Sequence, residues 1–388
     1  MATMSDQTSP EPLTGIFTPE QRRALFRNTN VDGNQKPIDI FTYGGGAVGA
    51  LYSWIISLGS RPVNFTMACR SNYSMVQSSG FTIDSTLFGP GQFRPQKVIR
   101  DVFEVACPND PTKSIVEYDL VFVCTKASGK VDIPAHIVTP GKTAIILFQN
   151  GINIEAPYKE AFPLNPVISA VLYISCSQPV PGKIVHVGDI DIVKLGLYPD
   201  LPAREPTHPS LQLISDLLQG GGCNAAAIPH IQSYRWLKTV YNGCWNVLCA
   251  VSGLDTHAFL ASSPRAREAA RALSQELIAV AKRALGILGA DGQLASEGEG
   301  EGKVAKEALM LWSSEAATAG WNIALAERLV PITPSMLEDA RKGMEMEVEA
   351  FCGEVVRTGE RLGVELPVLK ALYPILQAMN YRFKQARV

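Results

Sequence analysis

The chain has 388 residues, of which 46% are hydrophobic and 19% are charged, and its formal net charge is −2. The absence of a basic excess argues against a nucleic-acid partner, and the apolar content argues against a disordered chain. We therefore expect a folded protein with two domains whose partner is a small molecule.

Residues 1–37 are polar and contain prolines, and we interpret them as an N-terminal extension. Within it, residues 18–26 have the pattern of a short capped helix. The first regular domain is expected to begin with the apolar run that follows, at residue 38.

The first predicted strand, residues 38–43, leads into the pattern G-x-G-x-x-G and then into a helix-like sequence. Strand, turn and helix are the context in which this pattern binds a dinucleotide pyrophosphate at the helix N-terminus. Gly44 would form the turn, Gly46 would let the phosphates approach the backbone, and Gly49 would let the helix pack on the strand. The predicted cofactor-binding loop is Gly44, Gly45, Gly46, Ala47, Val48 and Gly49. A purely structural glycine turn is the alternative.

The next predicted strand, residues 63–69, is followed by Arg70 at the position where an NAD enzyme usually carries Asp or Glu. A guanidinium can bind a ribose 2′-phosphate through two hydrogen bonds, whereas a carboxylate would repel it. Arg70 therefore favours NADPH over NADH as the cofactor. An arginine that is only solvated at a strand end is the alternative.

Two apolar runs, residues 120–124 and 143–148, have the character of buried parallel strands in a doubly wound sheet. Lys126 follows the first run and Asn150 follows the second. Both side chains are thus expected at the carboxyl edge of the sheet, where open α/β sheets bind ligands. A solvated lysine and an Asn-Gly turn are the structural alternatives.

Three further strands are predicted at residues 170–174, 183–187 and 191–195, and we expect them to extend the same sheet. The proline-rich stretch 198–209 is the predicted linker. We therefore divide the chain into an NADP-binding Rossmann-type domain at 38–205 and a helical domain at 206–388. The Gly- and Glu-rich stretch 291–303 is interpreted as a solvated loop without an assigned role.

A predicted helix at residues 236–249 carries Lys238, Asn242 and Asn246 on successive turns of one face, among apolar and aromatic residues. A lysine in such surroundings is costly to bury unless it is paired, neutral or used in chemistry. The alternative is a lysine whose amine reaches solvent above two asparagines that bond the backbone.

Helical spacing over residues 335–351 puts Glu347 in the middle of an inward-facing stripe that also contains Met336, Ala340 and Phe351. One buried acid and one buried lysine in the same domain suggest a charge pair between Glu347 and Lys238. On the residues alone, this pair could be structural or catalytic.

Eight cysteines show no C-x-x-C pairing, and five histidines show no metal-ligand spacing. These patterns predict free thiols in a reducing compartment and no metal site. The sequence contains neither an apolar run of membrane-spanning length nor a secretory signal pattern, so we expect a cytoplasmic protein without a membrane partner.

Together, these motifs make the chain resemble the ketopantoate reductase (2-dehydropantoate 2-reductase) family between residue 38 and about residue 373. The resemblance rests on the glycine loop, on Arg70, Lys126 and Asn150-Gly151, on the helix with Lys238, Asn242 and Asn246, and on Ser335-Met336-Leu337 with Glu347 after it. It implies a Rossmann-type α/β domain followed by an all-α domain, as in 6-phosphogluconate dehydrogenase. It also implies hydride transfer from NADPH to the C2 carbonyl of a 2-keto acid, with ketopantoate reduced to pantoate in pantothenate biosynthesis.

The resemblance also implies roles for individual residues. The residue at Lys238 acts as the general acid, and the one at Glu347 helps to hold the far hydroxyl of the substrate. Asn242, Asn246 and Ser335 match residues that contact the substrate, and Lys126 and Asn150 match residues near the cofactor and the reacting end. A homodimer is a further expectation.

The chain departs from the family pattern at three places. Ile332 stands where the family commonly has Asn in the substrate pocket, Cys352-Gly353 replaces a usual Asn-Gly, and the connection 257–333 is longer than usual. Two alternatives therefore accompany the ketopantoate assignment. One is a related NADPH-dependent reductase acting on a larger ketone in secondary metabolism, and the other is a non-catalytic NADP(H) sensor.

Overall fold

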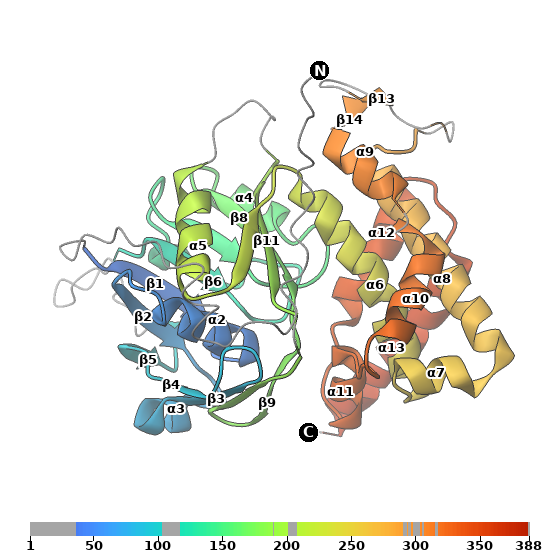
Figure 1. Ribbon diagram of the computed structural model, residues 1–388. Coiled ribbons are helices and arrows are strands. Elements are labelled where there is room, and N and C mark those ends of the chain that lie inside the picture. The colour runs from blue at the N-terminus through green and yellow to red at the C-terminus, as the bar shows by residue number, and fades with distance from the viewer. Residues whose placement is uncertain are drawn as a thin grey trace, which may run out of the picture.

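The computed structural model describes residues 36–102, 117–188, 190–200, 208–289, 293, 296–297, 303–304, 306–314 and 317–386. The helix predicted at 18–26 and most of the loop predicted at 291–303 lie outside these residues. The described chain forms a sheet-rich half and a helical half that lie side by side (Figure 1).

The main sheet has eight strands in the order β12-β11-β8-β7-β6-β1-β2-β5. They are β1 (Ile38–Tyr43), β2 (Val63–Ala68), β5 (Lys97–Ile99), β6 (Leu120–Val123), β7 (Ala144–Leu147), β8 (Val167–Tyr173), β11 (Ile192–Tyr198) and β12 (Asn224–Ala227). The strands from β5 to β8 pair in parallel, whereas β11 runs antiparallel to β8. Because β6 and β7 are apolar and buried along their whole length, they occupy the centre of the sheet. The predicted Rossmann-type sheet is confirmed.

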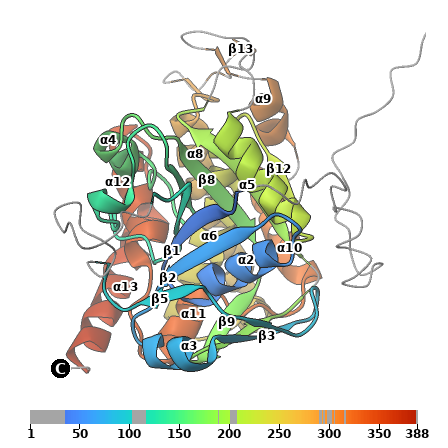
Figure 2. The ribbon, with the colours of Figure 1, turned by 90° about the vertical axis from the view of Figure 1, so that its left-hand side faces the viewer.

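Helices cover both faces of this sheet (Figure 2). Those of the sheet-rich half are α2 (Ala47–Ser57), α3 (Tyr73–Ser79), α4 (Ala156–Ala161) and α5 (Pro209–Gly220), with a 3-10 turn η2 (Ala135–Ile137). α2 packs against α5 on one face, and α6 (Ile231–Ser252) of the helical half packs against β8 and β11 on the other. The close approach of α6 depends on Gly196 of β11, where a Cβ would lie 2.4 Å from Cβ of Ile231.

A second sheet has four strands in the order β4-β3-β10-β9. These are β3 (Phe81–Ser85), β4 (Gly91–Phe93), β9 (Cys176–Val180) and β10 (Lys183–His186). The prediction that residues 183–187 extend the main sheet is therefore wrong. The turn at Gly182, where φ is +79°, folds β10 back onto β9, and the other edge of β10 pairs with β3.

The helical half is built around α6, which ends at Gly253 in the left-handed conformation with φ +76°. The other elements are α7 (Thr256–Ser262), α8 (Pro264–Ala284), α9 (Lys306–Ser313), α10 (Ala319–Arg328), α11 (Ser335–Arg341), the π-helical turn η4 (Glu349–Gly353), α12 (Glu354–Arg361) and α13 (Pro367–Gln385), with β13 (Ser296–Glu297) and β14 (Lys303–Val304). Trp245 and Phe351 lie fully buried in its core. The predicted helical second domain is thus confirmed. None of the described helices combines the length and apolar character needed to cross a membrane.

The main sheet continues past the linker predicted at 198–209. β12 pairs in parallel with β11, and α5 packs on α2, so both belong structurally with the sheet. We therefore propose that the boundary between the two halves lies between Ala227 and Ile231, in place of the division after residue 205 expected from the sequence.

Candidate functional site

The glycine loop between β1 and α2 has the tight geometry expected from its sequence. Gly44 has φ +109°, a left-handed conformation that favours glycine. A Cβ at Gly49 would lie 2.2 Å from the carbonyl oxygen of Gly44, so only glycine lets α2 pack this closely on the turn. A Cβ at Gly45 would likewise lie 2.4 Å from Sγ of Cys69.

Gly46 is different, because a Cβ there would meet no atom within 4 Å. Gly46 is exposed and is the N-cap residue of α2, and no side chain caps this helix. The first N–H groups of α2 are therefore available to an anion, as a dinucleotide pyrophosphate requires. Ala47 and Val48 supply the first two residues of this helix end. The loop thus fits the cofactor that the sequence predicts.

Arg70 follows β2 at the same edge of the sheet, and its side chain is exposed. The side chain of Asn72 joins this corner to the loop, since Nδ2 donates to the carbonyl oxygen of Gly45 at 2.6 Å and to Oε1 of Gln178 at 3.3 Å. Arg70, two residues before Asn72, therefore lies near the glycine loop and is exposed. An exposed arginine at this position is compatible with the 2′-phosphate that the sequence predicts.

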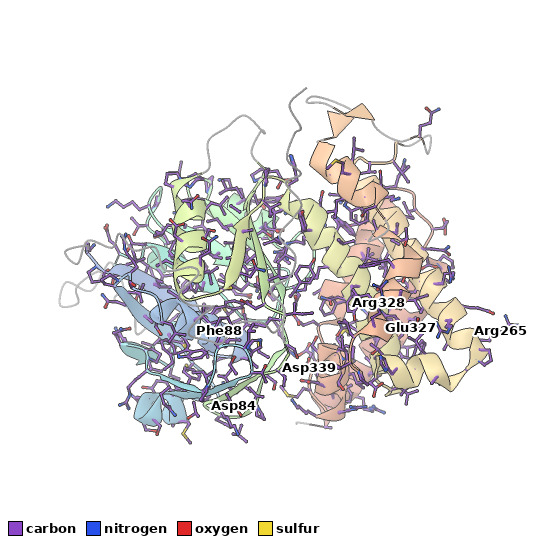
Figure 3. The ribbon with its side chains drawn as sticks, viewed as in Figure 1. Asp84, Phe88, Arg265, Glu327, Arg328 and Asp339 are labelled. Carbon is purple, nitrogen blue, oxygen red and sulfur yellow. The ribbon has the colours of Figure 1, made fainter. Side chains whose placement is uncertain are left out.

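Lys126, after β6, connects the sheet to the helical half. Its Nζ lies 2.6 Å from Oδ2 of Asp339 on α11 and donates to the carbonyl oxygen of Glu345 at 2.9 Å. Figure 3 places Asp339 on the side of the helical half that faces the sheet, whereas Arg265 lies on its far side. Lys126 therefore lies at the junction of the two halves, near the carboxyl edge of β6.

Lys238 of α6 points back toward the sheet. Its Nζ donates to Oδ1 of Asn150 at 2.7 Å and lies 5.9 Å from the ring centre of Tyr173. Burial, together with the positive charge of Arg235, lowers the pKa of Lys238 to about 7, although Glu347 and Cys176 act in the opposite direction. Near neutral pH the amine can therefore both hold and release a proton.

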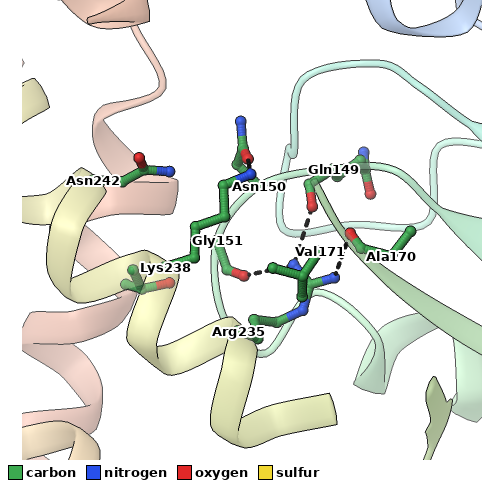
Figure 4. A pocket seen from close by; sticks show the side chains of 9 residues that line it. Gln149, Asn150, Gly151, Ala170, Val171, Arg235, Lys238 and Asn242 are labelled. Carbon is green, nitrogen blue, oxygen red and sulfur yellow. Dashed lines mark hydrogen bonds between the residues drawn. The ribbon is translucent and has the colours of Figure 1, made fainter. Parts of the chain in front are cut away.

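A pocket opens beside this amine, between α6 and the carboxyl edge of the sheet (Figure 4). Its empty volume is about 190 Å³, which includes space open to solvent. It is lined by Gln149, Asn150, Gly151, Ala170, Val171, Arg235, Lys238, Thr239 and Asn242. Three of the predicted site residues, Asn150, Lys238 and Asn242, thus share one pocket although they come from both halves.

Asn246, one turn beyond Asn242, has a different environment. Its Oδ1 accepts hydrogen bonds from Oγ of Ser335 at 3.1 Å and from the backbone N–H of Met336 at 2.9 Å. Asn246 therefore binds the first turn of α11 and fixes the position of Ser335. Because Oδ1 of Asn246 already accepts these two hydrogen bonds, the geometry favours a role in positioning Ser335 over direct contact with a substrate.

Glu347 does not lie on the continuous helix expected over 335–351. α11 ends at Arg341, Gly343 adopts φ +62°, and Glu347 lies in the irregular segment just before η4. Its Oε1 accepts the N–H of Ala127 at 3.4 Å, and among the described residues it makes no ion pair with Lys238. The predicted charge pair therefore takes the form of a through-space interaction, without an ion-pair contact between these two residues. Burial raises the pKa of Glu347, and the nearby Lys126 opposes this effect.

Two residues near Lys238 were not predicted from the sequence. Cys176 on β9 is close enough for its thiol and Lys238 to shift each other's pKa. Arg235 lies on α6 one turn before Lys238 and lines the same pocket. The sequence did contain a signal for Arg235, since it is a second basic residue in a mostly apolar helix. It contained no signal for Cys176, because the distance between Cys176 and Lys238 depends on how β9 folds.

Two family models match the chain. The model described as "Ketopantoate reductase PanE/ApbA" matches residues 40–200. The model described as "Ketopantoate reductase PanE/ApbA C terminal" matches residues 230–380. The first match lies within the sheet-rich half, and the second covers the helical half from α6 onward.

Individual proteins are similar over different shares of their length. The crystal structure of 2-dehydropantoate 2-reductase from Methylococcus capsulatus aligns with a TM-score of 0.69 and 27% identity, covering 89% of this chain and 98% of that chain. An uncharacterized protein of Saccharomyces cerevisiae is 25% identical, over 90% of this chain and 95% of the relative. The Meiotically up-regulated gene 72 protein of Schizosaccharomyces pombe is 29% identical over 55% of this chain, but the match spans only 38% of that relative.

Proposed function

The chain belongs to the ketopantoate reductase family, and from this premise we propose that it uses NADPH to reduce the C2 carbonyl of a 2-keto acid, most directly 2-dehydropantoate to pantoate. This activity would make it an oxidoreductase of CH-OH groups in pantothenate biosynthesis. The observation that carries the proposal is the hydrogen bond of 2.7 Å from Nζ of Lys238 to Oδ1 of Asn150. It holds a lysine with a lowered pKa at the sheet edge where such folds bind their ligands.

The residues that would hold the cofactor lie along one edge of the sheet. The loop from Gly44 to Gly49 and the uncapped end of α2 fit its pyrophosphate, and the exposed Arg70 fits its 2′-phosphate. Lys126 and Asn150 would lie nearer the reacting end, after β6 and β7. When bound, NADPH supplies the hydride.

Lys238 would supply the proton. As the carbonyl carbon gains the hydride, negative charge develops on the carbonyl oxygen, and a nearby ammonium stabilises this charge and can neutralise it. The hydride electron pair forms the new C–H bond at C2, and the proton from Nζ completes the hydroxyl group. Lys238 is left as a neutral amine and regains a proton from solvent.

The other polar groups would bind the substrate. Asn242 lines the pocket beside Lys238, and Ser335 lies at the start of α11, where Asn246 fixes it. Glu347 would bind the far hydroxyl of the substrate, exchanging its long contact with the N–H of Ala127 for this hydrogen bond.

Ile332 supports a second candidate, a related reductase that acts on a bulkier ketone. The backbone N–H of Ile332 donates to Oγ1 of Thr256, and the N–H of Thr256 donates to the carbonyl oxygen of Ile332, each at 3.2 Å. This segment is therefore fixed just before Ser335. An apolar side chain there offers no hydrogen bond where the family commonly has an asparagine.

NADPH consumption by the purified protein distinguishes the two reductases. Ketopantoate should be compared with a panel of bulkier 2-keto acids and cyclic ketones, and kcat/KM should be measured for each. We expect ketopantoate to have the highest kcat/KM. Activity confined to the bulkier ketones would instead identify a reductase of secondary metabolism with the same hydride chemistry.

A non-catalytic NADP(H) sensor is the remaining alternative. Such a sensor would bind NADPH but would not oxidise it when any keto compound is added. The lysine with a lowered pKa speaks against it, because a binding module has no need for this group in its pocket. Three expectations stay predictions: the cytoplasmic location, the lack of a metal and the homodimer. For the homodimer, Ile375 and Tyr381 on α13 are exposed apolar and aromatic side chains that a partner subunit would cover.

A further inference from the structure

Arg235 is an arginine buried at the junction of the two halves, with a relative exposure of 3%. It lies on α6 one turn before Lys238, and its side chain enters the sheet-rich half. Its partner Glu155 is fully buried, and Nε of Arg235 lies 2.8 Å from Oε1 of Glu155. A buried ion pair of this kind is retained at a cost in desolvation, so its position calls for a role other than stability.

All N–H groups of the Arg235 guanidinium have acceptors. Nη1 donates to the carbonyl oxygens of Gln149 at 3.0 Å and Gly151 at 2.9 Å. Nη2 donates to Oγ of Ser169 at 2.5 Å and to the carbonyl oxygen of Ala170 at 3.4 Å, while Nε is shared between Ser169 and Glu155. Five donors are thus used, and none is left to bind a substrate.

The two carbonyl groups bound by Nη1 flank Asn150, whose side chain accepts the hydrogen bond from Lys238 (Figure 4). Successive turns of α6 therefore hold the same three-residue segment, one through its backbone and the other through its side chain. Gly151 has φ +102°, which favours glycine, and a Cβ there would lie 3.2 Å from Cβ of Ala350, so this segment also packs closely against η4 of the helical half.

We propose that Arg235 is a positioning residue of the proposed reductase, which holds residues 149–151 so that Asn150 directs the amine of Lys238 into the pocket. The effect of Arg235 on turnover rests on the proposed function. The effect of Arg235 on the Lys238 amine can be measured in the free protein, without turnover.

The charge of Arg235 adds an electrostatic effect to this geometry. Several groups face Lys238: Arg235 on the same helix, Cys176 on β9, Tyr173 on β8, and Glu347 before η4. After burial, Arg235 is the largest influence that lowers the pKa of Lys238, whereas Glu347 and Cys176 raise it. Glu155 is not among the groups that shift it, so removal of the Arg235–Glu155 pair should act on Lys238 mainly through the loss of Arg235.

Two variants separate the geometric and electrostatic effects. Arg235→Lys keeps the charge but replaces the fork with a single nitrogen that cannot span both carbonyls. The double variant Arg235→Gln, Glu155→Gln removes both charges and leaves neither one buried alone. Arg283→Gln is the matched control, because Arg283 also donates to two backbone carbonyls, those of Gly289 and Leu362, far from the pocket.

The first readout is the reactivity of Lys238 toward acetic anhydride, followed from pH 5 to 10 by peptide mass spectrometry. Because only the neutral amine reacts, the midpoint reports the lysine pKa without turnover. We expect a midpoint of about 7 in the wild type and in Arg283→Gln. Arg235→Lys should keep this midpoint, and the double variant should raise it, because the positive charge beside Lys238 is then absent.

The second readout is steady-state reduction by the full-length protein. Arg235→Lys and the double variant should each lower kcat at least about tenfold with little change in KM, because misplacement of the acid affects the chemical step. Arg283→Gln should keep wild-type kcat. A wild-type kcat and midpoint in both Arg235 variants, or losses equal to those of Arg283→Gln, would overturn the inference. A wild type without turnover would count against the proposed function only. Arg235→Lys should still change the rate at which the neutral amine of Lys238 is labelled above the midpoint, because Asn150 no longer directs it, and an unchanged labelling rate would overturn the inference.

Discussion

Replacement of Lys238 by alanine should lower kcat by about 10²- to 10⁴-fold, the usual contribution of a positioned general acid. The reason is local: the variant loses both the proton donor and the positive charge at the place where the carbonyl oxygen becomes negative. NADPH binding should change little, since the glycine loop and Arg70 lie elsewhere along the sheet edge. Single-turnover measurements at saturating NADPH would separate the chemical step from binding.

Lys194→Ala is the matched control for this variant. Lys194 of β11 is also a partly buried lysine, whose Nζ lies 5.8 Å from the ring centre of Tyr234, and burial lowers its pKa. It makes no contact with Asn150, so kcat should stay close to the wild-type value. Wild-type kcat in Lys238→Ala, or equal losses in the two variants, would show that Lys238 is not the acid.

The pH dependence follows from the direction of the shift. An acid must be protonated to act, and burial and Arg235 lower the pKa of Lys238 to about 7. The kcat/KM value, which reports the free enzyme, should therefore be high below pH 7 and fall as the pH rises through about 7. Bound anionic ligands would raise this pKa, so the limb in kcat should lie at higher pH. Neither limb should remain in Lys238→Ala.

Replacement of Arg70 by alanine should weaken NADPH binding by about 10- to 100-fold, as expected for the loss of charge-assisted hydrogen bonds worth about 1.5–3 kcal/mol. NADH has no 2′-phosphate, so its dissociation constant should change much less. The same selectivity should appear for adenosine 2′,5′-bisphosphate against AMP. Isothermal titration with the four ligands measures these affinities without turnover.

Arg94→Ala is a suitable control, because Arg94 is an exposed arginine of the same half that bonds the carbonyls of Gln77 and Ser78, away from the glycine loop. It should leave all four affinities unchanged. Equal losses of NADPH and NADH affinity in Arg70→Ala would mean that Arg70 does not read the 2′-phosphate, and the preference for NADPH would then be wrong.

The sequence predicted most of what depends on local pattern. The apolar runs 120–124 and 143–148 are typical of buried central strands and contain β6 and β7, and the glycine spacing is typical of a turn into a helix such as α2. Because parallel strands share one carboxyl edge, the positions of Lys126 and Asn150 followed directly. A period of about four residues likewise placed Lys238 and Asn242 on the same face of α6.

The failures arose where a single residue or a distant pairing overrides the local pattern. The left-handed turn at Gly343 ends the helical period of α11, so Glu347 does not lie where that period would put it. β10 pairs with β3, about a hundred residues earlier, and no local signal marks such a partner. β12 is the alanine-rich strand Asn224–Ala227, which lacks the β-branched residues typical of strands.

The most direct test of the proposed reduction follows the hydride itself. The protein should be incubated with ketopantoate and NADPH that carries deuterium at C4 of the nicotinamide, in each of the two stereochemical forms. We expect one form to deliver its deuterium to C2 of pantoate, as seen by mass spectrometry and NMR, and we expect Lys238→Ala to slow this transfer. Tight NADPH binding without label in the product, from either form and with every ketone tested, would contradict it and identify a protein that binds the cofactor without catalysis.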